Sequence, residues 1–237
     1  MTTDQKELSP RTVARIAGVL YLVIILTAGF SEGFVRASII VPGDAAATAE
    51  NIAASEGLFR LGFASDLVAF LCDLAVSILL YVLLKPAGRT LAMIVAAFRL
   101  LAHPAIASVN LLNHLAPVLL PGGVEPYASM DPAHVQSLTM LFLELHGYGY
   151  LIGGAFFGVH LVLLGYLLHK SELFPTVLGI LVAVAGAGYL LESFGMFLAP
   201  SGEALYTWVV TITAVAGEVI LTLWLLIKGV RTASTQT

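Results

Sequence analysis

The sequence contains little cysteine and little charge, and each shortage excludes a class of protein. Its single cysteine, Cys72, excludes a disulfide framework and any zinc or iron–sulfur site built from cysteines. Charged residues make up 11% of the 237 residues, whereas an ordinary soluble domain contains about 25%. With a net charge of −4, the chain also lacks the basic face that nucleic-acid binding requires. A soluble enzyme, a disordered chain and a nucleic-acid binder are therefore excluded.

Hydrophobic residues, in contrast, make up 59% of the chain, and its mean hydropathy is +0.95. Six stretches have the roughly 20 apolar residues that cross a hydrocarbon core. They are residues 12–30, 61–84, 91–112, 147–168, 176–198 and 205–227. Continuous apolar segments satisfy their backbone hydrogen bonds in lipid as helices. We therefore predict an all-α integral membrane protein, a single six-helix transmembrane domain over residues 1–237, with short amphipathic helices on its outer side.

Two longer connections, residues 31–60 and 113–146, are expected on the outer side of the membrane. Asp44 is a suitable N-cap for a short helix that begins at Ala45. Asp131 followed by Pro132 predicts a second helix start, and that helix continues into the fourth span. The first span could instead be a cleaved signal peptide, but it lacks a clear small-x-small cleavage site, so we expect it to be retained.

The lysines and arginines are distributed unevenly around the spans. One side has eight of them: Lys6, Arg11, Arg15, Lys85, Arg89, Lys170, Lys228 and Arg231. The opposite side has only Arg36 and Arg60, while Arg99 falls inside a span. Because positive charge is retained in the cytoplasm, both termini are predicted to be cytoplasmic, in the inner membrane of a bacterium.

Ionisable residues inside a span are costly and therefore suggest a functional site. Asp66 and Asp73 are seven residues apart and share one face of the second span. Arg99 and His103 are four residues apart and share a face of the third span. We predict an ion pair between Asp73 and Arg99, because either charge alone in lipid would cost several kcal/mol. Such a pair can equally be a structural device that sets the helix register.

One ion pair does not explain all the polar residues in the spans. The candidate site residues are Asp66, Asp73, Arg99, His103, Asn110, His146, Tyr150, Glu192 and Glu218. Their number on the outward half predicts a polar cavity that opens to the outside and takes a small molecule or a lipid. Carboxylates and histidines at graded depths can also pass protons.

The histidines raise two further alternatives. His146 and His160 are 14 residues apart on nearly the same helix face, a spacing that stacked haems can use. His103, His146 and His160 are also secondary candidates for a metal site, since imidazole with carboxylate suits zinc. No His-x-x-x-His or His-Glu-x-x-His motif supports the metal site. We predict no cofactor, with haem and zinc left as alternatives.

Several segments resemble a bacterial membrane-protein family known as domain of unknown function 4386. They are residues 14–18, 41–52, 58–62, 98–100, 110–113, 146–150 and 224–229. The resemblance covers nearly the whole chain, and its most specific part is the run Val41-Pro42-Gly43-Asp44. It implies a six-helix membrane protein with no agreed activity and no catalytic residues to carry over. It also directs attention to four residues within or beside these segments, namely Arg60, Arg99, His146 and Tyr150.

Three functions remain open from the sequence. The first is binding or transport of a small molecule or lipid through the polar cavity. The second is an intramembrane enzyme, either a metal-dependent hydrolase or a haem-linked redox protein. The third is a structural membrane subunit whose polar residues only hold the helices together. The expected partner is the lipid bilayer, without nucleic acid, and the sequence does not determine the oligomeric state.

Overall fold

The computed structural model of the chain describes residues 8–120 and 130–231, and its regular structure in these ranges is helical throughout. Six helices there are long and apolar enough to cross a membrane. They are Pro10–Ile39, Glu56–Ala87, Arg89–Leu119, Pro132–Lys170, Thr176–Leu198 and Pro200–Ile227. The predicted fold class is thus confirmed. Lys6 and residues 121–129 of the second expected connection lie outside the described residues.

The first span is longer than the sequence predicts. It consists of α1 (Pro10–Gly29), the π-helical segment η1 (Phe30–Arg36) and α2 (Ala37–Ile39). The prediction ends the span at residue 30, because polar residues follow there. In the structure the helix continues, since the side chains of Ser31 and Arg36 are buried and have polar partners inside the protein. Hydropathy alone does not reveal such partners.

The next elements contain the predicted short helix and two more spans. Asp44 caps α3 (Ala45–Ala54) and accepts a hydrogen bond from the Ala47 amide at 2.9 Å, as predicted. The second span is α4 (Glu56–Leu84) with a 3₁₀ turn, η2 (Lys85–Ala87). The third is composed of α5 (Arg89–Leu100), the π-helical η3 (Leu101–Ala107) and α6 (Ser108–Leu119).

The second half of the chain forms the remaining three spans. Helix α7 (Pro132–Lys170) has 39 residues, about twice the number that a bilayer core requires. Asp131 caps it by accepting a hydrogen bond from the Ala133 amide at 2.8 Å, which confirms that predicted start. After α8 (Thr176–Leu198), the last span consists of η5 (Pro200–Gly202), α9 (Glu203–Ala214), the π-helical η6 (Val215–Val219) and α10 (Ile220–Ile227).

Helices α7 and α8 pack with their backbones in close approach through two pairs of glycines. A Cβ atom added to Gly158 would lie 2.9 Å from the carbonyl oxygen of Gly186. A Cβ atom at Gly165 would lie 2.4 Å from the carbonyl oxygen of Gly179. Small residues at such contacts allow membrane helices to approach closely without a hydrophobic driving force between them.

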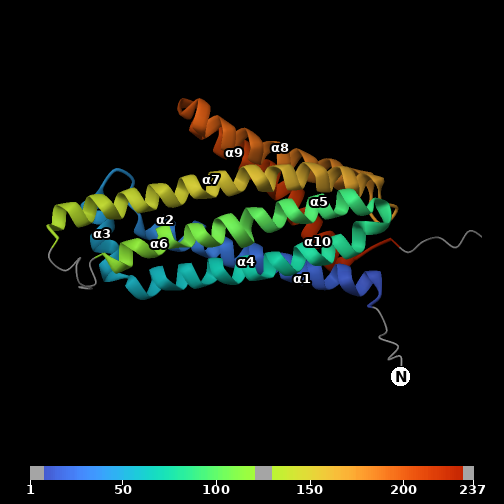
Figure 1. Cartoon of the computed structure of the whole chain (residues 1–237), viewed down its shortest axis with the longest axis horizontal. Helices are drawn as coiled ribbons and strands as arrows, with labels where there is room; N and C mark the ends of the chain where they lie inside the picture. Colours follow the sequence, from blue (N-terminus) through green and yellow to red (C-terminus); the bar gives the residue numbers. More distant parts are fainter. Residues whose placement is uncertain (1–7, 121–129, 232–237) are drawn as a thin grey trace, which may run out of the picture.

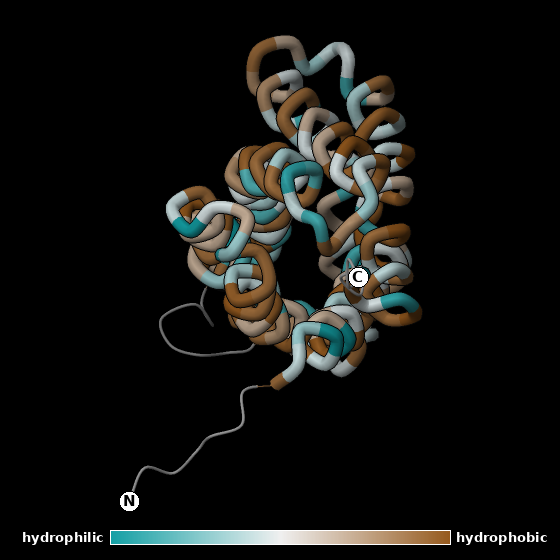
Figure 2. Tube along the Cα trace, turned by 90° about the vertical axis from the view of Figure 1, so that its right-hand side faces the viewer, coloured by the Kyte–Doolittle hydropathy of each residue, from teal (hydrophilic) through white to brown (hydrophobic). Residues whose placement is uncertain are grey.

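The long helices run side by side along the molecule (Figure 1). The start of α1 and the end of α10 lie at one end of the bundle, and α3 lies at the other. Seen along its length, the bundle has much of its hydrophobic colour on its outward faces (Figure 2). Trp208 and Leu198 are 68% and 81% exposed, an arrangement that suits contact with lipid tails.

Candidate functional site

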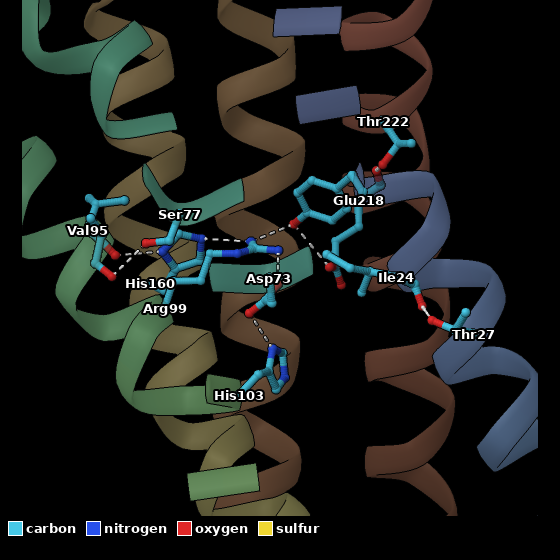
Figure 3. A network of polar contacts seen from close by, with 12 residues as sticks. Ile24, Thr27, Asp73, Ser77, Val95, Arg99, His103, His160, Glu218 and Thr222 are labelled. Carbon is cyan, nitrogen blue, oxygen red and sulfur yellow. Dashed lines mark hydrogen bonds and ion pairs between the residues drawn. The ribbon is translucent and has the colours of Figure 1, made fainter. Parts of the chain in front are cut away.

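The polar residues of the spans gather into two buried clusters. The central cluster contains Tyr21, Asp73, Arg99, His103, His160, Tyr189 and Glu218. Each of the six spans contributes at least one of these residues. Figure 3 shows most of this cluster, with Arg99 lying between His160 and Asp73. The central cluster therefore joins all six spans through side-chain contacts.

The ion pair predicted between Asp73 and Arg99 is the centre of this cluster. Both side chains are almost fully buried, and Arg99 Nη2 contacts Asp73 Oδ1. Arg99 Nη1 donates to the hydroxyl of Tyr21 at 2.9 Å and lies 3.2 Å from Nε2 of His160. The guanidinium also lies over the Tyr21 ring, 4.5 Å from its centre. Beyond the pair itself, Arg99 is thus fixed by contacts with two further spans, the first through Tyr21 and the fourth through His160.

Tyr21 connects this ion pair to Glu218. The Tyr21 hydroxyl donates to Glu218 Oε2 at 3.3 Å, and the Tyr189 hydroxyl donates to Glu218 Oε1 at 2.8 Å. Among the described residues, Glu218 has no ion-pair partner. The carboxyl group of Glu218 is therefore held by hydroxyl donors alone, unlike that of Asp73.

His103 forms the opposite end of the central cluster. Its Nδ1 lies 3.0 Å from Asp73 Oδ2. The ring lies between Phe70 and Phe157, with centroid distances of 5.9 and 4.6 Å. The His103 side chain is 22% exposed, whereas Asp73 and Arg99 are 1% exposed. His103 is thus more accessible than the Asp73–Arg99 ion pair that it contacts.

The outer cluster lies two helical turns along α4 from Asp73, nearer to α3. It contains Ser31, Arg36, Asp66, Asn110, His114, His146 and Tyr150. Asp66 Oδ2 accepts hydrogen bonds from Arg36 Nη1 at 2.8 Å and from Ser31 Oγ at 2.9 Å. Arg36 also pairs with the exposed carboxylate of Glu32 at 2.5 Å. A second buried ion pair, Arg36–Asp66, is therefore present in the membrane region.

Two histidines of the outer cluster lie beside Asp66. Nδ1 of His146 lies 3.1 Å from the carbonyl oxygen of Asn110, whose amide donates to the carbonyl oxygen of His146 at 2.7 Å. Nε2 of His114 lies 3.2 Å from the carbonyl oxygen of Phe59. The ligand atoms that Asp66, His114 and His146 can offer all lie within 4.8 Å of one another.

The three π-helical segments of the spans all carry cluster residues. Segment η1 contains Ser31 and Arg36, η3 contains His103, and η6 contains Glu218. A π-helical turn inserts an extra residue into the helix and rotates the side chains that follow, and such turns are frequent at functional sites. In η3, Pro104 also lacks the amide proton that a regular α-helix would use.

Eight of the nine candidates from the sequence fall in these clusters. Asp73, Arg99, His103 and Glu218 belong to the central one, and Asp66, Asn110, His146 and Tyr150 belong to the outer one. Glu192 is partly buried and belongs to neither. Asp66 and Asp73 share a helix face but lie in different clusters. Arg60 forms an exposed pair with Glu56 at 2.7 Å, outside both clusters.

Five members of the clusters are not among the candidates from the sequence: Tyr21, Ser31, Arg36, His114 and Tyr189. Tyrosines carry no charge at neutral pH, so a search for ionisable residues in the spans does not find them. Arg36 falls in a predicted loop because the predicted first span ends at residue 30, too early. A longer first span would have paired Arg36 with Asp66 by the same argument that pairs Asp73 with Arg99.

In the described part of the chain, two hollows lie away from the candidate site residues. One is lined by residues of η5 and α9, from Pro200 to Thr211. Another lies between Pro10, Lys85 and Lys170. Most of the candidate residues are instead buried and pack against one another. An outward-opening cavity lined by them stays a prediction.

Comparison with known proteins places the chain in a family. A family model described as "Domain of unknown function (DUF4386)" matches residues 16–229. A protein of Archaeoglobus fulgidus, described as an uncharacterized protein, is 31% identical over 157 residues, which cover 66% of this chain and 76% of the relative. No solved structure matches the chain. The match over nearly its whole length shows that the chain belongs to the family described as domain of unknown function DUF4386.

Proposed function

We propose that the chain transports a small solute across the cytoplasmic membrane and uses the central cluster to bind the proton that drives transport. The observation that carries the proposal is the continuous chain of contacts from Glu218 through Tyr21, Arg99 and Asp73 to His103. Acidic and histidine side chains linked in this way inside spans are typical of proton relays in transporters.

Glu218 is the group of this chain best suited to take up a proton. Asp73 is held as a carboxylate by Arg99, and a proton on Asp73 would leave a buried cation without its partner. Glu218 makes no ion pair among the described residues, so its protonation removes a charge without exposing another one. Because Tyr21 bonds both Glu218 and Arg99, a proton on Glu218 would alter a contact of the central ion pair.

The competing function is a structural one, in which the central cluster only holds six helices together. Buried polar contacts do set helix register in some proteins. The two functions differ in the effect of Glu218→Gln. Its amide oxygen can accept a hydrogen bond from one tyrosine and its amide nitrogen can donate to the hydroxyl oxygen of the other, while the titratable group is lost. A structural role requires only the hydrogen bonds of the side chain at residue 218, whereas proton coupling requires that this side chain can bind and release a proton.

The test is proton flux into liposomes that contain the purified protein and a pH-sensitive dye, under an imposed membrane potential. A panel of amino acids, sugars and organic acids is added outside. We expect at least one solute to start a proton flux, which Glu218→Gln abolishes and which the exposed control Glu203→Gln leaves unchanged. An unaltered flux in Glu218→Gln would refute the proton role, and the absence of any solute-dependent flux would refute transport.

The proposed orientation has both termini in the cytoplasm. Lys85 and Lys170 line the same hollow as Pro10, and Gly229 lies beside Arg11. Three of the cations predicted to be cytoplasmic therefore lie at the end of the bundle where α1 starts and α10 ends (Figure 1). At the other end, Arg36 is buried against Asp66, and Arg60 is paired with Glu56. The imbalance of free positive charge that orients a membrane protein is therefore larger than the sequence suggests.

A further inference from the structure

The outer cluster contains three side chains of a kind that binds metal ions. They are Asp66 of α4, His114 of α6 and His146 of α7, which are 0%, 0% and 3% exposed. Each offers one ligand atom, and these atoms lie within 4.8 Å of one another. In a tetrahedral zinc site, ligand atoms at about 2.1 Å from the ion lie about 3.4 Å apart. Side-chain movements of about 1 Å would therefore bring the three atoms around one ion.

The hydrogen bonds of both histidines leave one nitrogen of each ring with a free electron pair. A carbonyl oxygen only accepts, so Nδ1 of His146 carries the proton that it donates to Asn110. Nε2 of His146 then has a free electron pair. By the same argument, Nε2 of His114 donates to the carbonyl oxygen of Phe59 and leaves Nδ1 with the free pair. Metal-binding histidines are held in their ligand tautomer by such second bonds.

Two of the atoms that these three side chains can offer to an ion have no hydrogen-bond partner among the described residues. They are Nε2 of His146 and Oδ1 of Asp66, both buried. The other oxygen of Asp66 is oriented by Ser31 and Arg36, so Oδ1 is the one left over. A buried polar atom without a partner is destabilising, and a bound ion is one of the few features that account for it.

From this geometry we infer that Asp66, His114 and His146 form a binding site for a divalent transition-metal ion of the zinc class. Two imidazole nitrogens and one carboxylate oxygen suit zinc and its neighbours, whereas magnesium and calcium prefer oxygen ligands alone. Three protein ligands leave a fourth position for water or for an oxygen of a bound molecule. The inference goes beyond the proposed function and does not depend on it, because no residue of the central cluster takes part.

Arg36 is the group that exchanges with the ion. Its Nη1 lies 3.1 Å from Nδ1 of His114, so the guanidinium donates to the electron pair that the metal uses. Arg36 has other contacts to which it can move, since it pairs with Glu32 and lies 5.5 Å from the centre of the Tyr150 ring. Asp66 and Glu32 together carry one negative charge more than Arg36 neutralises. That surplus attracts a cation into the outer cluster.

The direct test is zinc binding to the detergent-purified full chain after treatment with a chelator. We expect one zinc ion per chain by equilibrium dialysis and elemental analysis, with a higher melting temperature once zinc is added. His146→Gln and Asp66→Asn should lose both effects. His134→Gln removes an exposed histidine of the same helix, α7, and should keep both. Ser31→Ala, which removes a bond that orients Asp66, should weaken binding about tenfold.

Two further measurements keep the test decisive if a ligand variant does not fold. Cobalt bound to the wild-type chain should give the strong visible absorption of a four-coordinate ion, without the thiolate band that binding at Cys72 would add. Arg36→Met should bind zinc more tightly than the wild type and should depend on zinc for its stability, because the ion replaces the charge that balances Asp66. A wild-type chain that binds no zinc, or that loses it in His134→Gln, would overturn the inference.

Discussion

Gly149 of α7 lies directly against the side-chain amide of Asn110 of α6. A Cβ atom at Gly149 would come within 2.2 Å of both Cγ and Oδ1 of Asn110. From this position the Asn110 amide donates to the carbonyl oxygen of His146, while the carbonyl oxygen of Asn110 lies 3.1 Å from Nδ1 of His146. The absence of a side chain at residue 149 thus allows Asn110 to hold His146 in place.

Gly149→Ala is therefore expected to destabilise the protein. The new methyl group displaces the Asn110 amide and breaks its bond to His146, at a cost of about 1–3 kcal/mol in the free energy of unfolding. Gly147→Ala on the same helix is the matched control, since a Cβ atom there meets nothing within 4 Å. It should be neutral or stabilise by about 0.5–1 kcal/mol. The stabilities of both variants can be measured by unfolding in mixed detergent micelles, monitored by circular dichroism. Equal stabilities would contradict the packing of Gly149 against Asn110.

Removal of one member of the central ion pair should be severe. Arg99→Met leaves Asp73 as a buried charge without its cation, which costs about 3–5 kcal/mol. Arg60→Met removes a cation from an exposed pair with Glu56 and should cost less than about 1 kcal/mol. The same unfolding measurement compares the two variants. A small loss in Arg99→Met would show that the central ion pair contributes little to stability.

Exchange of the two charges should rescue folding only in part. The double variant Asp73→Arg with Arg99→Asp restores a pair of opposite charges and should be more stable than Arg99→Asp alone. It should remain less stable than the wild type, because a carboxylate at residue 99 would face the free electron pair of His160 Nε2. Full recovery in a double-mutant cycle would mean that the contacts of Arg99 beyond Asp73 add no stability.

Gly165→Ala should separate α7 from α8. Its methyl group would lie 2.4 Å from the carbonyl oxygen of Gly179 and 2.6 Å from the amide nitrogen of Ala183, and backbone atoms cannot rotate away. We expect a loss of about 3 kcal/mol or a failure to purify as a monodisperse species. Gly57→Ala, where the added Cβ atom meets nothing within 4 Å, should purify normally. Similar behaviour of the two variants would refute the close α7–α8 packing.

The orientation can be tested by labelling single cysteines in a Cys72→Ser background. Ala46→Cys lies on α3, and Glu172→Cys follows α7 at the opposite end of the bundle; both positions are exposed. With a maleimide that does not cross membranes, we expect Ala46→Cys to react in intact cells and Glu172→Cys to react only after permeabilisation. The reverse pattern would place both termini outside.

Some element boundaries were predictable because local chemistry sets them. Asp44 and Asp131 cap their own helices through the side chain, so the starts of α3 and α7 follow from a few neighbouring residues. Both ends of α8 match the prediction, Thr176–Leu198. The end of the first span did not follow, because the burial of Ser31 and Arg36 depends on Asp66, which is 30 residues away from Arg36.

The π-helical segments η1, η3 and η6 were also not predictable from the sequence. Pro104 marks η3 as irregular, but η1 and η6 contain ordinary residues. Their geometry places Arg36, His103 and Glu218 against partners in other spans. The contacts with these partners stabilise the irregular helix, and they come from residues outside the local sequence. An argument from local helix propensity does not include the stabilisation from these contacts.

The sequence by itself determined that this protein is a bundle of six membrane-spanning helices. The length of each apolar segment and its scarcity of charge determine whether that segment lies in lipid or in water. The sequence also predicted the pair Asp73–Arg99, since two opposite charges in lipid must find each other. Only the tertiary structure decided that the polar residues form two separate clusters. Tyr21 links Arg99 to Glu218 in the central cluster, and Arg36 pairs with Asp66 in the outer cluster. The reason is physical: hydropathy reports the cost of burying each residue alone, whereas the partners that offset this cost come from distant spans.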